Sequence, residues 1–120
     1  MNIAVIDDEL HILSMLEMAL SRNSHFSVRA FSDPLVALDE LHTWKPDVVL
    51  LDIMMPQMDG IEVLKEIKKR HKETKVIMMT ANTTLERVIS SHHLGADNYL
   101  LKPFESLRAV EQEIVRVINQ

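Results

Sequence analysis

The stretch Leu50–Gly60, LLDIMMPQMDG, passes from apolar residues through a carboxylate into a turn. With Val48 and Val49 before it, it begins as a continuous apolar run, which is typical of a strand covered on both faces. Pro56 and Gly60 then belong to turn chemistry, because proline sets one φ angle and glycine permits another. Asp52 therefore lies where a buried strand ends, and a carboxylate in that place indicates chemistry rather than packing.

Four other strand-like runs alternate with amphipathic stretches along the chain. The amphipathic stretches repeat apolar residues at spacings of three and four, which favours helices. Residues 26–30 instead alternate apolar and polar side chains, which predicts a half-buried strand near a sheet edge. Five strands that are each followed by a helix predict parallel pairing through crossovers, and hence an α/β sandwich. The remaining predicted strands are Ile3–Ile6, Val76–Met79 and Tyr99–Leu101.

Local signals place the start of the second helix. Asp33 is expected to be its N-cap, because a carboxylate can accept hydrogen bonds from the backbone N–H groups of the first turn, which have no partner within the helix. Pro34 suits the first turn, because proline has no backbone N–H that would need a partner there. Leu35, Leu38 and Leu41 follow at helical spacing and predict its apolar stripe.

The ends of two further helices are also marked. Lys68-Lys69-Arg70 suits the C-terminus of the third helix, and we interpret this basic run as a solvated helix end. Gly95 is expected to close the fourth helix. Methionines fill irregular gaps in cores, and packing is the expected role of Met15, Met18, Met78 and Met79.

Composition limits the class of protein. The chain has 120 residues, which suits one domain, and no cysteine, so no disulfide framework is expected. Its net charge of −5 argues against direct binding of nucleic acid by this domain. No apolar run approaches the ~20 residues that a membrane helix needs, and the start MNIAVIDDE does not resemble a signal peptide. A cytoplasmic domain is therefore expected.

The polar residues that follow the predicted strands share one edge of the sheet. In a parallel sheet the carboxyl ends of the strands lie along one edge, where open α/β folds bind ligands. Two unit charges ~4 Å apart repel by about 4 kcal/mol at an effective dielectric of ~20, so clustered carboxylates call for a cation. Oxygen ligands of this kind favour Mg²⁺, and Asp8 could in addition cap the first helix. The residues at this edge are Asp7, Asp8, Asp52, Thr80 and Lys102.

Four motifs in this order carry a family resemblance. They are VIDDE at 5–9, LLDIMMPQMDG at 50–60, MMTA at 78–81 and YLLKPF at 99–104. With them the chain resembles a response-regulator receiver domain of two-component signalling, similar to the chemotaxis regulator, over residues 1–120. The resemblance implies a flavodoxin-like three-layer sandwich, with a five-stranded parallel sheet in the order 2-1-3-4-5 and five helices.

By this resemblance, Asp52 is the phosphoryl acceptor, and its carboxylate becomes an aspartyl phosphate. Mg²⁺ would be bound by Asp8, Asp52 and the backbone carbonyl of Met54, and by Asp7 through water. Lys102 would contact the phosphoryl oxygens as a point charge.

The resemblance also implies a switch. The Thr80 hydroxyl would donate a hydrogen bond to the phosphoryl group, and Tyr99 would move from a more exposed to a buried rotamer. The altered surface would comprise the fourth helix, fifth strand and fifth helix. The Lys102-Pro103 peptide bond is expected to be cis, as in the family.

The implied partners are a sensor histidine kinase or phosphotransfer protein, and an output domain or target protein. A dimer formed on phosphorylation is a further option, and no membrane partner is expected. The domain would promote only its own phosphorylation and dephosphorylation, so it is not expected to be an enzyme. The sequence leaves open whether it is the excised N-terminal part of a longer regulator or a free-standing receiver that relays phosphate or docks on a target.

Three other classes fit the residues less well. A nucleotide- or flavin-binding module needs a phosphate cradle after the first strand, where this chain has Asp7-Asp8-Glu9 and repels anions. A phosphohydrolase with an aspartate nucleophile usually carries a second carboxylate two residues later, where this chain has Met54. A receiver that has lost phosphorylation would lack some of the five site residues, all of which are present here.

Overall fold

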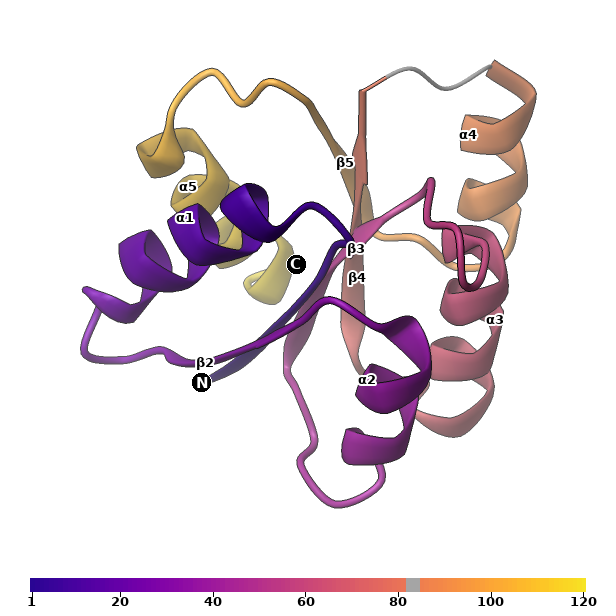
Figure 1. Cartoon of the computed structure of the whole chain (residues 1–120), viewed down its shortest axis with the longest axis horizontal. Helices are drawn as coiled ribbons and strands as arrows, with labels where there is room; N and C mark the ends of the chain where they lie inside the picture. Colours follow the sequence, from indigo (N-terminus) through magenta and orange to yellow (C-terminus); the bar gives the residue numbers. More distant parts are fainter. Residues whose placement is uncertain (82–84) are drawn as a thin grey trace.

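Five parallel strands form one sheet in the order β2-β1-β3-β4-β5, as expected (Figure 1). This computed structural model describes residues 1–81 and 85–120, and leaves the side chains of 85–87 undescribed. A helix follows each strand along the chain, so every connection crosses from one strand to a parallel one. The strands are β1 (Asn2–Ile6), β2 (Ser27–Phe31), β3 (Val48–Asp52), β4 (Lys75–Thr80) and β5 (Asn98–Leu101).

The helices cover both faces of the sheet. α1 (Leu10–Ser21) and α5 (Leu107–Ile118) pack on one face, and α2 (Pro34–Glu40), α3 (Gly60–Arg70) and α4 (Leu85–His93) lie on the other (Figure 1). Val48 and Leu50 belong to the core beneath α1 and α5, whereas Val49 and Leu51 belong to the opposite core. The continuous apolar run of β3 follows from this arrangement, because successive residues of a strand face opposite layers.

The strand register brings four strand ends together. Ile6 lies beside Leu51, so Asp7, which follows β1, lies close to Asp52 at the end of β3. Asp52 in turn lies beside Met79, one residue before Thr80 at the end of β4. The Lys102 backbone N–H donates to the Thr80 carbonyl oxygen at 2.8 Å, which holds the chain after β5 against β4.

The helix signals are largely confirmed. The Asp33 carboxylate accepts from the Leu35 backbone N–H at 2.9 Å, and Pro34 begins α2. Gly95 has a φ of 103°, the left-handed conformation that closes a helix, and the Lys102-Pro103 bond is cis. The N-cap of α1 is Glu9, not Asp8, and its side chain makes no capping hydrogen bond.

Two predictions about apolar faces are wrong. Leu35 is 57% exposed, because the buried face of α2 comprises Pro34 and Ala37 and continues at Leu41 beyond the helix. On α1, Met15 and Met18 are exposed, whereas Met78 and Met79 of β4 are fully buried as expected. A seven-residue helix buries only a narrow stripe, so a leucine one position away from that stripe meets solvent.

Gly60 lets the end of β3 and the start of α3 lie in contact. Its backbone N–H donates to the Ile53 carbonyl oxygen at 2.8 Å, and Asp59 caps the helix by accepting from the Ile61 N–H at 2.8 Å. A Cβ atom at Gly60 would lie 2.1 Å from the Asp52 carbonyl oxygen and 2.7 Å from the Ile53 Cα. Those atoms are backbone and cannot rotate away, so any side chain here would displace the strand end that carries Asp52.

We therefore expect Gly60→Ala to lower the free energy of unfolding by about 2–4 kcal/mol, as overpacking against backbone does. Gly95→Ala is the matched control, since its Cβ would meet only the flexible Lys68 side chain at 3.3 Å and its cost comes from the positive φ, about 1 kcal/mol. Urea unfolding of both variants measures the difference. Equal, small losses for the two would show that the contact around Gly60 is not tight.

Candidate functional site

Three carboxylates gather at the carboxyl edge of the sheet, as the sequence predicts. Asp7 and Asp8 follow β1 and Asp52 ends β3, and each offers an oxygen within 4.8 Å of the others. Asp7 is fully buried, Asp52 is 5% exposed and Asp8 is half-buried. Oxygen donors at this spacing suit a divalent cation such as Mg²⁺, with Asp8 nearest to solvent.

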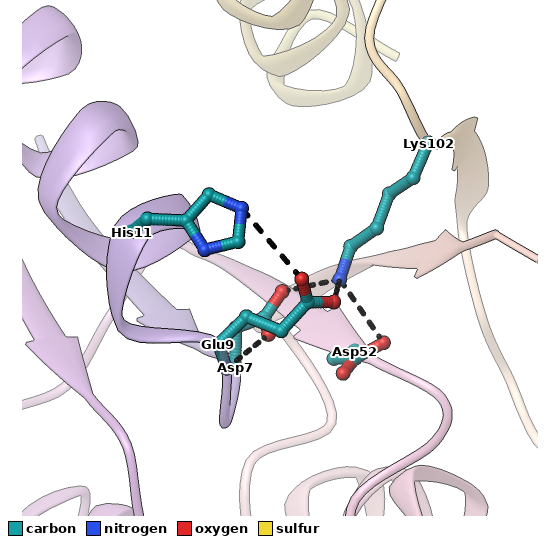
Figure 2. A network of polar contacts seen from close by, with 5 residues as sticks. All are labelled: Asp7, Glu9, His11, Asp52 and Lys102. Atoms are coloured by element: carbon teal, nitrogen blue, oxygen red, sulfur yellow. Dashed lines mark hydrogen bonds and ion pairs between the residues drawn. The ribbon is translucent and has the colours of Figure 1, made fainter.

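Lys102 reaches into this cluster from the segment after β5. Its Nζ lies 2.6 Å from Asp7 Oδ2 and 3.4 Å from Asp52 Oδ1 (Figure 2). Burial alone would lower the pKa of Lys102, but the hydrogen bond and charge of Asp7, and then the charge of Asp52, outweigh it and leave the pKa raised. Lys102 therefore stays cationic and offsets part of the acidic charge.

The Asp52 carboxyl group titrates far from its ordinary range. Burial is the largest cause and the charge of Asp7 is next, and despite the opposing charge of Lys102 they raise the pKa of Asp52 to about 7. A hydrogen bond with Asp8 acts in the same direction as burial. Near neutral pH the group is thus divided between its neutral form and its anion.

Thr80 presents a buried hydroxyl group at the same edge. The residue is 4% exposed, and its Oγ1 has no hydrogen-bond partner among the residues that the structure describes. A buried hydroxyl without a partner is unfavourable by about 1–3 kcal/mol, so such a group is expected to have a ligand to bind.

Tyr99 lies on β5 with its ring directed toward α4. Its hydroxyl donates to the Val88 carbonyl oxygen at 3.0 Å and accepts from Ser91 Oγ at 3.1 Å. The ring is half-buried and packs against the core on the α2, α3 and α4 side of the sheet. This is the inward of the two positions that the sequence analysis expects of Tyr99.

Comparison with known proteins places this geometry in a family. The family model described as the response regulator receiver domain matches residues 3–114. This chain belongs to that family. Receiver domains are components of two-component signalling, and their family consists of signalling proteins rather than enzymes in the usual sense.

Individual relatives agree with this membership. The DNA-binding transcriptional regulator NtrC of Klebsiella pneumoniae is 43% identical over 106 residues, which are 88% of this chain and 22% of NtrC. Among solved structures, a CheY-like receiver domain protein from Methanospirillum hungatei has a TM-score of 0.93 at 27% sequence identity. The matched region comprises 98% of this chain and 93% of that protein's chain. The BeF3-activated receiver domain of DrrB has a TM-score of 0.88 at 30% identity, with 99% and 97% covered.

This receiver domain spans only a small part of some relatives. It covers 22–26% of the length of the NtrC regulators from Klebsiella pneumoniae and Proteus hauseri. Within the described residues, no helix has the length and apolarity required to cross a bilayer.

Glu9 is an acidic residue of the site that was not predicted from the sequence. Glu9 Oε1 lies 3.3 Å from Lys102 Nζ, and Glu9 Oε2 lies 3.8 Å from His11 Nε2 (Figure 2). Glu9 is exposed, so it covers Lys102 from the solvent side. The third acid of the Asp7-Asp8-Glu9 run was the available signal, but a side chain at the N-cap of α1 is usually assigned to the helix end.

Met54, whose carbonyl is predicted to bind the metal, points its side chain into solvent and is 60% exposed.

The raised pKa of Asp52 makes stability depend on pH. Between about pH 4, where the unfolded carboxyl group loses its proton, and about 7, where the folded one does, the folded state binds more protons. The contribution of Asp52 to the free energy of unfolding therefore falls as the pH rises through that window, and it stays low at higher pH. Without divalent ions, Asp52→Asn should raise the free energy of unfolding at pH 8 by roughly 1–3 kcal/mol and change it little near pH 4.

Urea unfolding in EDTA at several pH values measures this difference. The exposed residue Asp39 on α2 gives the control, since Asp39→Asn should alter stability slightly and equally at each pH. A stabilisation of Asp52→Asn that does not vary with pH would contradict the assignment.

Proposed function

We propose that this receiver domain, residues 1–120, accepts a phosphoryl group on Asp52 from the phosphohistidine of a sensor kinase or phosphotransfer protein. The observation that carries this proposal is the group of three carboxylates with Lys102 at 2.6 Å from Asp7 and 3.4 Å from Asp52. An ion pair made only for stability has no need of a third carboxylate beside it, whereas phosphoryl transfer needs a nucleophile and several fixed charges.

The transfer proceeds by attack of an Asp52 carboxylate oxygen on phosphorus. A new P–O bond forms and the P–N bond of the phosphohistidine breaks, so the electron pair stays on the imidazole nitrogen, which then takes a proton from solvent. With acetyl phosphate the bond that breaks is P–O, and acetate leaves. Only the ionised carboxylate can attack, so lowering the pKa of Asp52 by bound cations favours the reaction.

Fixed groups around Asp52 supply charge stabilisation. Asp8 and Asp52, with the Met54 carbonyl, would hold Mg²⁺, and Asp7 would hold it through water. Bound there, Mg²⁺ would supply neutralisation of negative charge on the phosphoryl oxygens. Lys102 would turn from Asp7 toward the phosphoryl group, a short movement because its Nζ already lies close to both carboxylates.

Thr80 and Tyr99 form the proposed switch. The buried Thr80 hydroxyl, which lacks a partner in the described part of the chain, would donate to a phosphoryl oxygen. Movement of Thr80 would favour the inward position of Tyr99, where its hydroxyl bonds Val88 and Ser91 of α4. The face formed by α4, β5 and α5 would then change its binding to an output domain or target protein.

The wider setting is also part of the proposal. The receiver would act in the cytoplasm, would change only its own phosphorylation, and would not itself bind nucleic acid. Its relatives include regulators named for DNA binding, of which it spans a small part, so control of an attached output domain is favoured. The alternatives are a free-standing phosphorelay intermediate or a docking regulator, and dimerisation on phosphorylation is a further option.

Phosphorylation can be tested by intact-mass measurement with acetyl phosphate and Mg²⁺. We expect one phosphoryl group on the wild type, none above background on Asp52→Asn, and normal labelling of Asp39→Asn. Omission of Mg²⁺ should reduce labelling strongly, because the site then keeps its acidic repulsion. Equal labelling of wild type and Asp52→Asn would place the acceptor elsewhere.

The switch can be tested by NMR with a beryllofluoride complex in place of the phosphoryl group. We expect amide shifts at Thr80 and from Tyr99 to Lys102 in addition to the metal pocket. Thr80→Ala should keep the shifts near Asp52 and lose those at Tyr99, because the hydroxyl is the proposed connection. Unchanged shifts at Tyr99 in that variant would refute the connection.

A further inference from the structure

A basic cavity lies at the opposite edge of the sheet from Asp52. Its volume is about 540 Å³, and it lies between the α2–β3 loop, the end of α3 and the α3–β4 loop. In Figure 1 these segments are at the bottom of the view, whereas β4 and β5 end toward the top. Four cationic side chains line it, Lys45, Lys69, Arg70 and Lys72, against two carboxylates.

The lysines of this cavity differ from the other lysines of the chain. All seven lysines lie in the described residues, and four of them form ion pairs: Lys65–Glu62, Lys68–Asp97, Lys75–Asp97 and Lys102–Asp7. The other three lysines form no ion pair with a carboxylate in the described part of the chain, and all of them line the cavity: Lys45, Lys69 and Lys72. In a chain with a net charge of −5, unpaired cations gathered at one cavity concentrate positive potential there.

A solvated helix end explains only part of this cluster. Lys69 and Arg70 belong to the last turn of α3, where cations favourably oppose the helix dipole, and Arg70 also pairs with Glu66 at 3.6 Å. Lys45 and Lys72 come from the two loops and lie outside the last turn of α3. Of the two acids, Asp47 already accepts from the Asn2 backbone N–H at 2.8 Å, and Glu73 is exposed.

His71 also lines the cavity, and its pKa responds to the positive potential of the cations there. Burial first, and then the positive charge of Lys45, lower its pKa, and the neighbouring His42 and Arg70 act in the same direction. An anion bound in the cavity would oppose these charges and raise the pKa of His71, so the imidazole provides a readout of occupancy.

We propose that this cavity binds a small anion that carries two or more phosphate groups. Its volume lies within the ~300–1,000 Å³ of small-molecule sites, and among the described residues no Phe, Tyr or Trp lines it to favour an apolar ligand. A long nucleic acid would extend beyond the four cations and meet the net negative charge of the chain. Free polyphosphate and the phosphate tail of a nucleotide offer the same chemistry.

The site is separate from the phosphorylation site. Asp47 at the cavity directly precedes β3, and Asp52 ends that strand five residues later, about 16 Å away at ~3.3 Å per residue. The Debye length at physiological ionic strength is ~8 Å, so the two fields are largely screened from each other. Binding here can therefore fail or succeed independently of phosphorylation at Asp52.

The test is an NMR titration of the metal-free protein with pyrophosphate in EDTA, at about 0.1 M salt. We expect amide shifts at Lys45, Asp47 and residues 69–74 with no shift near Asp7 or Asp52, and a raised pKa of the His71 imidazole. The triple variant Lys45→Gln, Lys69→Gln, Lys72→Gln should bind about tenfold more weakly. The matched control is Lys65→Gln, which changes a lysine of α3 outside the cavity and should bind as the wild type.

Further variants and ligands distinguish specific phosphate binding from a loss of folding or from general attraction to anions. The triple arginine variant at the same positions should keep binding, which separates charge from any loss of folding in the glutamine variant. Equal affinity for ATP and pyrophosphate would support recognition of the phosphate groups alone, and tighter binding of ATP would support a nucleotide as the source. Sulfate bound as tightly as pyrophosphate, a short DNA duplex bound more tightly, or unchanged affinity of the glutamine variant would each overturn the proposal.

Discussion

The ion pair between Lys102 and Asp7 is the interaction on which the site depends. Asp7 is fully buried, and its partner Nζ lies 2.6 Å away with a side chain that is 7% exposed. Removing one partner of a buried pair typically costs about 3–5 kcal/mol, because the remaining charge is left without compensation. The same ammonium group also opposes the charge of Asp52, so one side chain allows two carboxylates to remain buried a few ångströms apart.

Parallel pairing makes that arrangement possible. Asp52 lies 45 positions after Asp7 and 50 positions before Lys102 in the sequence. The three residues meet because β1, β3, β4 and β5 all end at one edge of the sheet. A shift of one residue in any register would turn a side chain to the other face of the sheet. Gly60 adds a second constraint, since it brings the start of α3 against the backbone of Asp52 and Ile53. The position of Asp52 thus follows from backbone hydrogen bonds and from the absence of a side chain at Gly60.

The sequence contained most of the fold and the centre of the site, for identifiable reasons. Buried parallel strands leave continuous apolar runs, and strand ends show where polar residues must converge, so the meeting of Asp7, Asp8, Asp52 and Lys102 could be predicted. Apolar spacing indicates a helix but not the width of its buried face, which is why Leu35, Met15 and Met18 were placed wrongly. Glu9 and the basic cavity depend on how loops fold in space, since Lys45 and Lys72 lie 27 positions apart.

The two ends of the sheet carry opposite charge, and hydrogen bonds link the wall of the basic cavity to a strand that ends at the acidic cluster. The Lys68 ammonium donates to the Thr74 carbonyl oxygen at 2.7 Å and to Asp97 at 2.9 Å, and Asp97 also accepts from the Val76 backbone N–H. These bonds attach the end of α3, one wall of the basic cavity, to the start of β4. β4 is the strand that ends in Thr80, whose hydroxyl is the proposed contact of the phosphoryl group. Because screening separates the two charge clusters, β4 offers a route by which a bound anion would influence the switch through a displacement of backbone rather than through its field.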